Sequence, residues 1–167
     1  MSRRVARADC FDASALVKVY AQEPRSAVVR SYFESRPTKY TTPFCYYEAL
    51  NILKAKWEHR SLLSREEYLN AAFRLTVWYQ ASAKHVDDLD LTNPQTFRLA
   101  QSLVEKFGLD LSDALQIVSV RDGYFAPLVN DSQTVLVTAD KDLAIAARRR
   151  TCVSGVRWKR IRRHEAL

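Results

Sequence analysis

Short apolar runs alternate along this chain with longer segments in which apolar residues recur every three or four positions. The short runs are typical of buried strands, and the longer segments are typical of amphipathic helices. Strands are predicted to end at Asp12 and to cover 39–42, 84–89, 134–137 and 156–158. Helices are predicted from about 14, and at 24–37, 43–59, 64–78, 93–108, 109–118 and 142–147. Strands that alternate with helices favour the α/β class, with a central, mostly parallel sheet flanked by helices.

Several helix boundaries carry their own signals. Ser64 and Glu67 have the spacing of a capping box, in which each side chain accepts a bond from the other residue's backbone N–H. The pair Asn93–Pro94 is typical of a helix start. The helices at 43–59 and 64–78 are predicted to form a hairpin that projects from the sheet. Their aromatic residues indicate either part of the core or the face of a homodimer.

The length and the net charge of the chain indicate the number of domains and the kind of binding partner. The chain has 167 residues, which suggests a single domain over 1–167. Its formal net charge of +7 favours a polyanionic partner such as nucleic acid. The basic residues concentrate in a C-terminal tail, 148–167, which contains Arg160, Arg162 and Arg163. This tail is interpreted either as a solvated basic segment or as an RNA-binding surface.

Composition disfavours several other classes of protein. No apolar run has the length of a membrane span, and no long apolar stretch follows the basic N-terminus, so a secretory signal is not expected. Cys10, Cys45 and Cys152 lack zinc-type spacing and are expected to be reduced thiols of a cytoplasmic protein. With three glycines in the whole chain, no Gly-rich phosphate loop is present. The three histidines lie apart, without the partners that a histidine acid–base nuclease needs.

Four acidic residues stand at positions where an α/β sheet binds ligands. Asp12 and Asp140 each follow a predicted strand, Asp113 opens an apolar helix, and Glu48 lies near the start of another. The ends of parallel strands and the starts of the following helices meet at one edge of the sheet, so these carboxylates are expected to converge. Clustered carboxylates repel one another unless a cation is present, and their oxygens suit Mg²⁺ or Mn²⁺. The alternative for Asp12 is a simple helix cap.

The segments that carry these acids resemble the successive motifs of a known family. They read FDASALVK at 11–18, EALNIL at 48–53, LSDALQI at 111–117 and LVTADKDL at 136–143. Their order and their local sequences resemble those of PIN-domain nucleases, and most closely those of the VapC-like toxins of type II toxin–antitoxin modules. The resemblance covers 10–147 and implies a three-layer PIN-like α/β domain. It also implies a Mg²⁺-dependent endoribonuclease, for which Mn²⁺ is a second candidate metal.

The resemblance implies a role for individual residues. The catalytic residues would be Asp12, Glu48, Asp113 and Asp140, with the three aspartates holding the metal. The supporting residues would be Ser14, Thr138 and Asp142. Lys18 and Arg121 are candidates for phosphate contacts, together with the three arginines of the tail. Asp110 is interpreted first as a helix cap and second as an outer partner of the metal.

The same resemblance implies partners. The substrate would be RNA, cleaved to leave 5′-phosphate and 3′-hydroxyl ends. A small antitoxin would insert a segment with Arg or Lys into the acidic groove, and the protein would form a homodimer in the cytoplasm, away from membranes. The loop at 124–132 is longer than in compact members of the family, which affects the choice of RNA and the dimer geometry. The alternative function is a non-catalytic RNA-binding or scaffold protein with a PIN-like fold.

Overall fold

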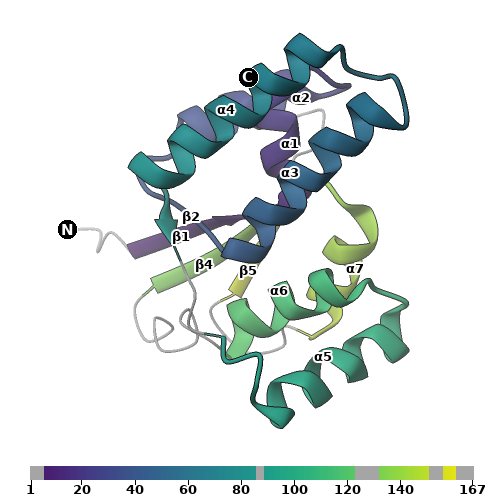
Figure 1. The fold of residues 1–167 in the computed structure, drawn as a ribbon. Helices are drawn as coiled ribbons and strands as arrows, with labels where there is room; N and C mark the ends of the chain where they lie inside the picture. Colours follow the sequence, from purple (N-terminus) through teal and green to yellow (C-terminus); the bar gives the residue numbers. More distant parts are fainter. Residues whose placement is uncertain (1–5, 86–88, 123–131, 151–155, 161–167) are drawn as a thin grey trace, which may run out of the picture.

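The computed structural model describes residues 6–85, 89–122, 132–150 and 156–160, and in it five strands form one sheet (Figure 1). The strands are β1 (Ala6–Phe11), β2 (Lys39–Thr41), β3 (Lys84–His85), β4 (Ser132–Thr138) and β5 (Val156–Arg160). Their order is β3-β2-β1-β4-β5, and every neighbouring pair of these strands is parallel. The central strand β1 pairs with β4 along its whole length, up to Phe11 opposite Val137.

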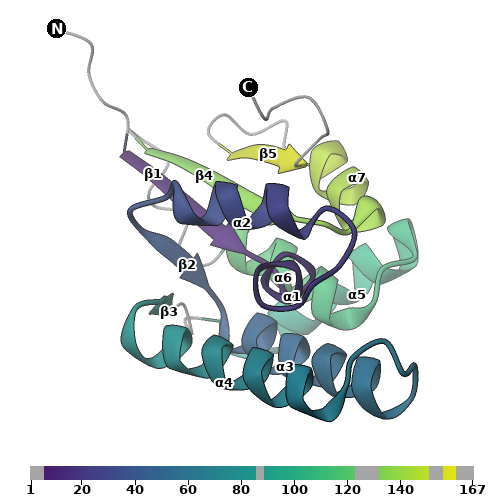
Figure 2. The ribbon, with the colours of Figure 1, turned by 90° about the horizontal axis from the view of Figure 1, so that it is seen from above.

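Helices cover both faces of this sheet. They are α1 (Ala13–Tyr20), α2 (Ser26–Glu34), α3 (Pro43–Glu58), α4 (Arg65–Ala81), α5 (Pro94–Phe107), α6 (Leu111–Asp122) and α7 (Lys141–Arg150). Helices α1 to α4 pack on one face, and α5 to α7 pack on the other (Figures 1 and 2). The predicted three-layer α/β architecture is confirmed.

The two central strands supply both halves of the core because their side chains alternate between the faces of the sheet. Phe11 and Val137 face α1 to α4, and both are fully buried. Cys10 and Leu136, one position earlier on the same strands, face α5 to α7 and are also buried. Apolar residues at consecutive positions are what a parallel sheet covered on both faces requires.

The hairpin of α3 and α4 packs against α1, which is seen end-on in Figure 2. Leu53 of α3 and Leu75 of α4 are fully buried in the same cluster as Leu16 of α1. The rings of Tyr46 and Tyr79 stack at 4.0 Å between the two helices. The aromatic residues at this seam therefore belong to the core. The dimer stays a prediction.

The structure also tests the predicted starts of one helix and one strand. Helix α2 begins at Ser26 and not at Pro24, because Arg25 adopts a left-handed conformation with φ of 70° that ends the preceding turn. The predicted strand at 156–158 is confirmed as the edge strand β5. Most of the predicted loop at 124–132, and the tail beyond 160, lie outside the described residues. Among the helices that the structure describes, none is long and apolar enough to cross a membrane.

Candidate active site

Asp12 follows the central strand β1 directly and caps α1. Its Oδ1 accepts a hydrogen bond of 2.7 Å from the backbone N–H of Ala15. Its own backbone N–H donates to the carbonyl of Val137 on β4, at 3.1 Å. The side chain is almost completely buried, with 2% of the residue exposed. The interpretation of Asp12 as a helix cap is therefore correct, but the cap uses only part of the carboxylate.

Two hydroxyl groups bind the rest of the Asp12 carboxylate. Ser14 Oγ lies 2.9 Å and 2.8 Å from the two carboxylate oxygens, and Thr138 Oγ1 donates to Oδ2 at 2.5 Å. The same hydroxyls accept from the backbone that follows β4. Ser14 Oγ accepts from Ala139 N at 2.9 Å, and Thr138 Oγ1 accepts from Asp140 N at 2.9 Å. Ser14 and Thr138 thus tie the ends of β1 and β4 together around one buried carboxylate.

Asp140 comes two residues after the end of β4 and directly precedes α7. Its Oδ1 accepts hydrogen bonds from the backbone N–H groups of Asp142, at 2.7 Å, and of Leu143, at 2.9 Å. One oxygen of the carboxylate is therefore used as a helix cap. Asp142 itself is exposed in the first turn of α7. The structure brings Asp12 and Asp140 to the same edge of the sheet, as the parallel strands predict.

Glu48 and Asp113 reach this edge from α3 and α6. Glu48 is half-buried, and both of its carboxylate oxygens accept hydrogen bonds from α6. Ser112 Oγ donates to Oε1 at 3.2 Å, and Gln116 Nε2 donates to Oε2 at 3.2 Å. Asp113 lies between these two donors in the sequence, in the first turn of α6.

Burial and mutual repulsion raise the pKa of three of these acids. Burial is the main cause of the rise in the pKa of Asp12 to about 7; the charge of Glu48 adds to it, and the bonds from Thr138, Ala15 and Ser14 oppose it. The pKa of Asp113 also rises to about 7, first through burial and then through the negative charges of Glu48, Asp12, Asp140 and Asp110.

The carboxyl of Glu48 has a raised pKa as well. Burial contributes most to this rise, the bond from Ser112 opposes it, and the charges of Asp110 and Asp140 add to it. Glu48 and Asp113 are therefore the two acids on which several of the other carboxylates act electrostatically. Asp110, at the start of α6, belongs to the same negative field.

The chemistry of this donor set fits a hard divalent cation. Carboxylate oxygens are the ligands that Mg²⁺ and Mn²⁺ take in proteins, and a cation would offset the repulsion that raises these pKa values. Within the described part of the chain, however, no three His, Cys, Asp or Glu side chains lie close enough together to ligate one ion. In the described part of the chain, the carboxylates therefore affect one another electrostatically, but they do not form a complete set of metal ligands.

The predicted phosphate contacts are placed less favourably than the acids. The ammonium of Lys18 donates to Glu23 Oε2 at 3.0 Å and to the carbonyl of Pro24 at 3.1 Å, so its charge is already paired. Arg121 lies in the last turn of α6, eight residues and about 12 Å along the helix from Asp113. Arg160 ends β5. Arg162 and Arg163 lie outside the described residues.

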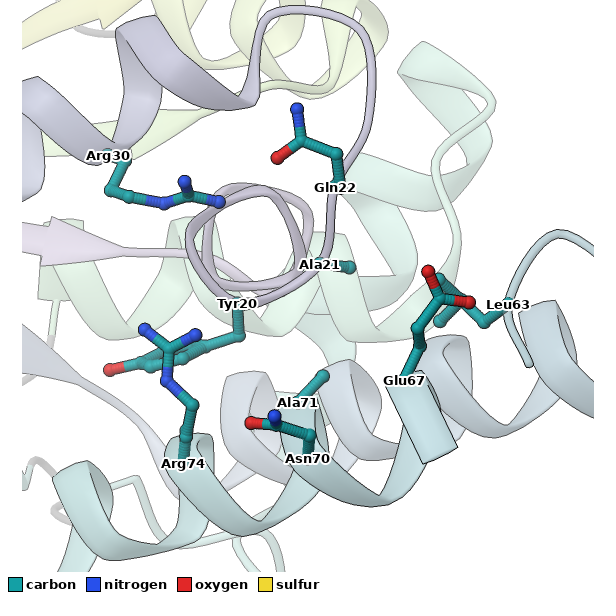
Figure 3. Close-up of a pocket in the computed structure, with 9 residues that line it drawn as sticks. All are labelled: Tyr20, Ala21, Gln22, Arg30, Leu63, Glu67, Asn70, Ala71 and Arg74. Atoms are coloured by element: carbon teal, nitrogen blue, oxygen red, sulfur yellow. The ribbon is translucent and has the colours of Figure 1, made fainter. Parts of the chain in front are cut away.

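A separate cavity of about 260 Å³ lies between α1, α2 and α4 (Figure 3). Two of its lining residues are cations. Arg30 donates through Nε to the carbonyl of Val19 at 3.1 Å, and the guanidinium of Arg74 lies 5.7 Å from the centre of the Tyr20 ring. The cavity contains none of the four acids, so we assign it no part in the chemistry of the acid cluster.

Two residues that contact the acid cluster, Ser112 and Gln116, are not among the residues predicted from the sequence. Both lie on α6, four residues apart and therefore on the same helix face. A polar Gln116 within the apolar run from Ala114 to Val118 was the available signal. Its partner Glu48 is 68 positions away, and no local pattern links the two residues.

Comparison with known proteins identifies the protein family to which this chain belongs. The sequence matches the family described as PIN domain over residues 10–149, and the chain therefore belongs to the PIN domain family. Among solved structures, it is similar to the crystal structure of Mycobacterium tuberculosis VapC20, described as a sarcin–ricin loop cleaving toxin. The TM-score is 0.56 at 14% identity, and the match covers 83% of this chain and 94% of that chain. A search of curated proteins found no significant match.

Proposed function

We propose that this protein is a metal-dependent endoribonuclease and the toxin of a toxin–antitoxin pair. Membership of the PIN domain family and the similarity to VapC20 support a ribonuclease toxin. The observation that carries the proposal is the convergence of Asp12, Glu48, Asp113 and Asp140 at one edge of the sheet, where burial and repulsion raise the pKa values of three of them. Sites that perform acid–base and metal chemistry show such shifts.

In this proposal each residue of the cluster has a role. Asp12, Asp113 and Asp140 would hold the metal, and the metal would supply an activated water and offset charge on the phosphodiester. Ser14 and Thr138 fix the carboxylate of Asp12 through their hydroxyls. Glu48 would complete the site by orienting the attacking water, and Asp142 would support the site from the start of α7.

The proposed partners follow from charge. The net charge of +7 attracts RNA, and the arginines of the C-terminal tail are the proposed phosphate contacts because Lys18 is already paired with Glu23. The proposed antitoxin would place a cationic Arg or Lys among the four carboxylates, where it offsets their repulsion. We further propose a homodimer that acts in the cytoplasm.

The direct test is RNA cleavage by the purified protein. We expect cleavage with Mg²⁺ or Mn²⁺ and none with EDTA, measured on transfer RNA, ribosomal RNA fragments and messenger RNA. Glu48→Gln should reduce the rate by at least about 100-fold, in the range found for loss of one acid–base group. Glu58→Gln is the matched control, because Glu58 is an exposed acid on the same helix, about 15 Å along it from Glu48. RNA binding without metal-dependent cleavage would favour the alternative, a non-catalytic RNA-binding or scaffold protein.

A further inference from the structure

Two side chains of helix α6 donate hydrogen bonds to the carboxylate of Glu48. Ser112 Oγ lies 3.2 Å from Oε1, and Gln116 Nε2 lies 3.2 Å from Oε2. Because the two donors are one helical turn apart, they bind the two oxygens of one carboxylate from the same face of α6. Glu48 is on a different helix, α3, so these contacts join two helices that each supply an acid to the cluster.

Gln116 is an unusual residue for its environment. It is 2% exposed and lies between Leu115 and Ile117, which are buried in the apolar core. Its carbonyl oxygen Oε1 is buried and has no hydrogen-bond partner among the residues that the structure describes. A buried polar group without a partner disfavours the folded state. Core packing alone would be served better by an apolar side chain, so stability does not explain the amide.

The surroundings of Glu48 explain why its carboxylate needs to be held. The negative charges of Asp110 and Asp140 act on it, and repulsion between like charges favours a rotamer that turns away from the cluster. Glutamate has three rotatable side-chain bonds, so other orientations are accessible to it. Two donors at opposite oxygens counteract both effects.

We propose that Gln116, with Ser112, is a positioning residue that fixes the Glu48 carboxylate within the acid cluster. The proposal rests on the ribonuclease function proposed above. Because Asp113 lies between the two donors on α6, the same turn of helix supplies one acid and orients another. The relative placement of Asp113 and Glu48 then depends on these two hydrogen bonds and on the packing of α6 against α3.

Gln116→Leu is the central test, since leucine has a similar volume and no hydrogen-bonding atoms. We expect kcat for RNA cleavage to fall by about 10- to 100-fold, the usual effect of losing a residue that orients a site side chain. KM for RNA should change little, because Gln116 is buried and cannot reach the substrate. The midpoint of thermal unfolding in EDTA should not fall, because the substitution removes the unpartnered carbonyl.

Ser112 provides a rescue experiment, and Ser119 provides the control. Ser112→Ala should lower kcat in the same way, whereas Ser112→Thr keeps a hydroxyl and should retain most of the activity. Ser119→Ala removes a buried hydroxyl from the same helix, about one turn beyond Gln116, and should leave kcat unchanged.

Two outcomes would overturn the proposal. The first is a Gln116→Leu variant with the parental kcat. The second is an activity loss that follows a lowered unfolding midpoint, which would make Gln116 a structural residue. If the unsubstituted protein cleaves no RNA with any metal, the proposed function fails instead. Crystal structures of the parent and of Gln116→Leu then decide this inference separately, because an unmoved Glu48 carboxylate would contradict it.

Discussion

At the scale of single residues, Asp12 combines a structural role as a helix cap with the chemical role that we propose for it. Its Oδ1 caps α1, and the hydroxyls of Ser14 and Thr138 bind the carboxylate at the junction of β1 and β4. These bonds lower its pKa, yet burial outweighs them and the net shift is upward. The folded protein therefore holds a group that prefers to be neutral at a place where repulsion from other acids adds to the effect.

This shift predicts how stability depends on pH in the absence of metal. The pKa of Asp12 is about 7 in the folded protein against an ordinary value of 3.8, so the unfolded chain loses this proton first as pH rises. Asp113 shifts in the same direction. The contribution of both groups to stability is therefore lost between pH 3.8 and about 7.

Asp12→Asn should reduce this loss, because asparagine keeps a capping oxygen and carries no charge. In EDTA at pH 8 we expect its unfolding midpoint to exceed that of the parent, by about 2–4 °C for each 1 kcal/mol gained in a domain of this size. Metal-dependent RNA cleavage should be abolished in the same variant. Asp90→Asn is the control with the opposite sign, since hydrogen bonds from Thr92 lower the pKa of Asp90. A folded Asp12→Asn variant that cleaves RNA at the parental rate would show that Asp12 is not in the active site.

At the scale of helices and strands, the sequence predicted the elements whose ends carry a local signal. The Ser64–Glu67 capping box is confirmed, and so is the cap of α5 by Asn93. The start of α2 was predicted two residues too early, because the left-handed conformation of Arg25 has no signature in the sequence. The packing of α3 and α4 on α1 was also missed. It depends on apolar contacts between distant segments, such as Leu16 with the cluster that contains Leu75, and helical periodicity does not say which partner an apolar face finds.

The packing of α4 gives a prediction at this scale. Leu75 is fully buried in the cluster with α1, whereas Leu69 on the same helix is 48% exposed. Leu75→Ala should lower the free energy of unfolding by about 2–5 kcal/mol, because it removes buried methyl groups and leaves a cavity. Leu69→Ala should change it by less than about 0.5 kcal/mol. Urea unfolding of both variants measures the difference. Equal effects would mean that α4 does not close the core.

At the scale of the whole molecule, the order of the strands explains why acids far apart in the sequence meet. Because β1 and β4 are adjacent and parallel, Asp12 and Asp140, which come after these strands in the chain, lie at the same carboxyl edge of the sheet. Helix starts gather at the same edge, which places Glu48 and Asp113 there. The order of strands and helices in the sequence is enough to predict that these acids lie at one edge of the sheet, and their role in a common site stays a prediction. The sequence could not predict the hydrogen bonds from Ser112 and Gln116, since these depend on how α3 and α6 pack.

The arrangement of the whole site also predicts the chemistry of the products. In the proposed reaction water attacks the phosphorus, so the 2′-hydroxyl of RNA is not the nucleophile. An RNA oligonucleotide with one 2′-deoxy sugar at the scissile position should still be cut, and its product should carry a 5′-phosphate. The rate should fall only moderately, because the 2′-hydroxyl contributes to recognition. Mass spectrometry of the fragments and an EDTA control measure both points. A cyclic 2′,3′-phosphate, or full activity in EDTA, would contradict a role for the four carboxylates in metal-dependent hydrolysis.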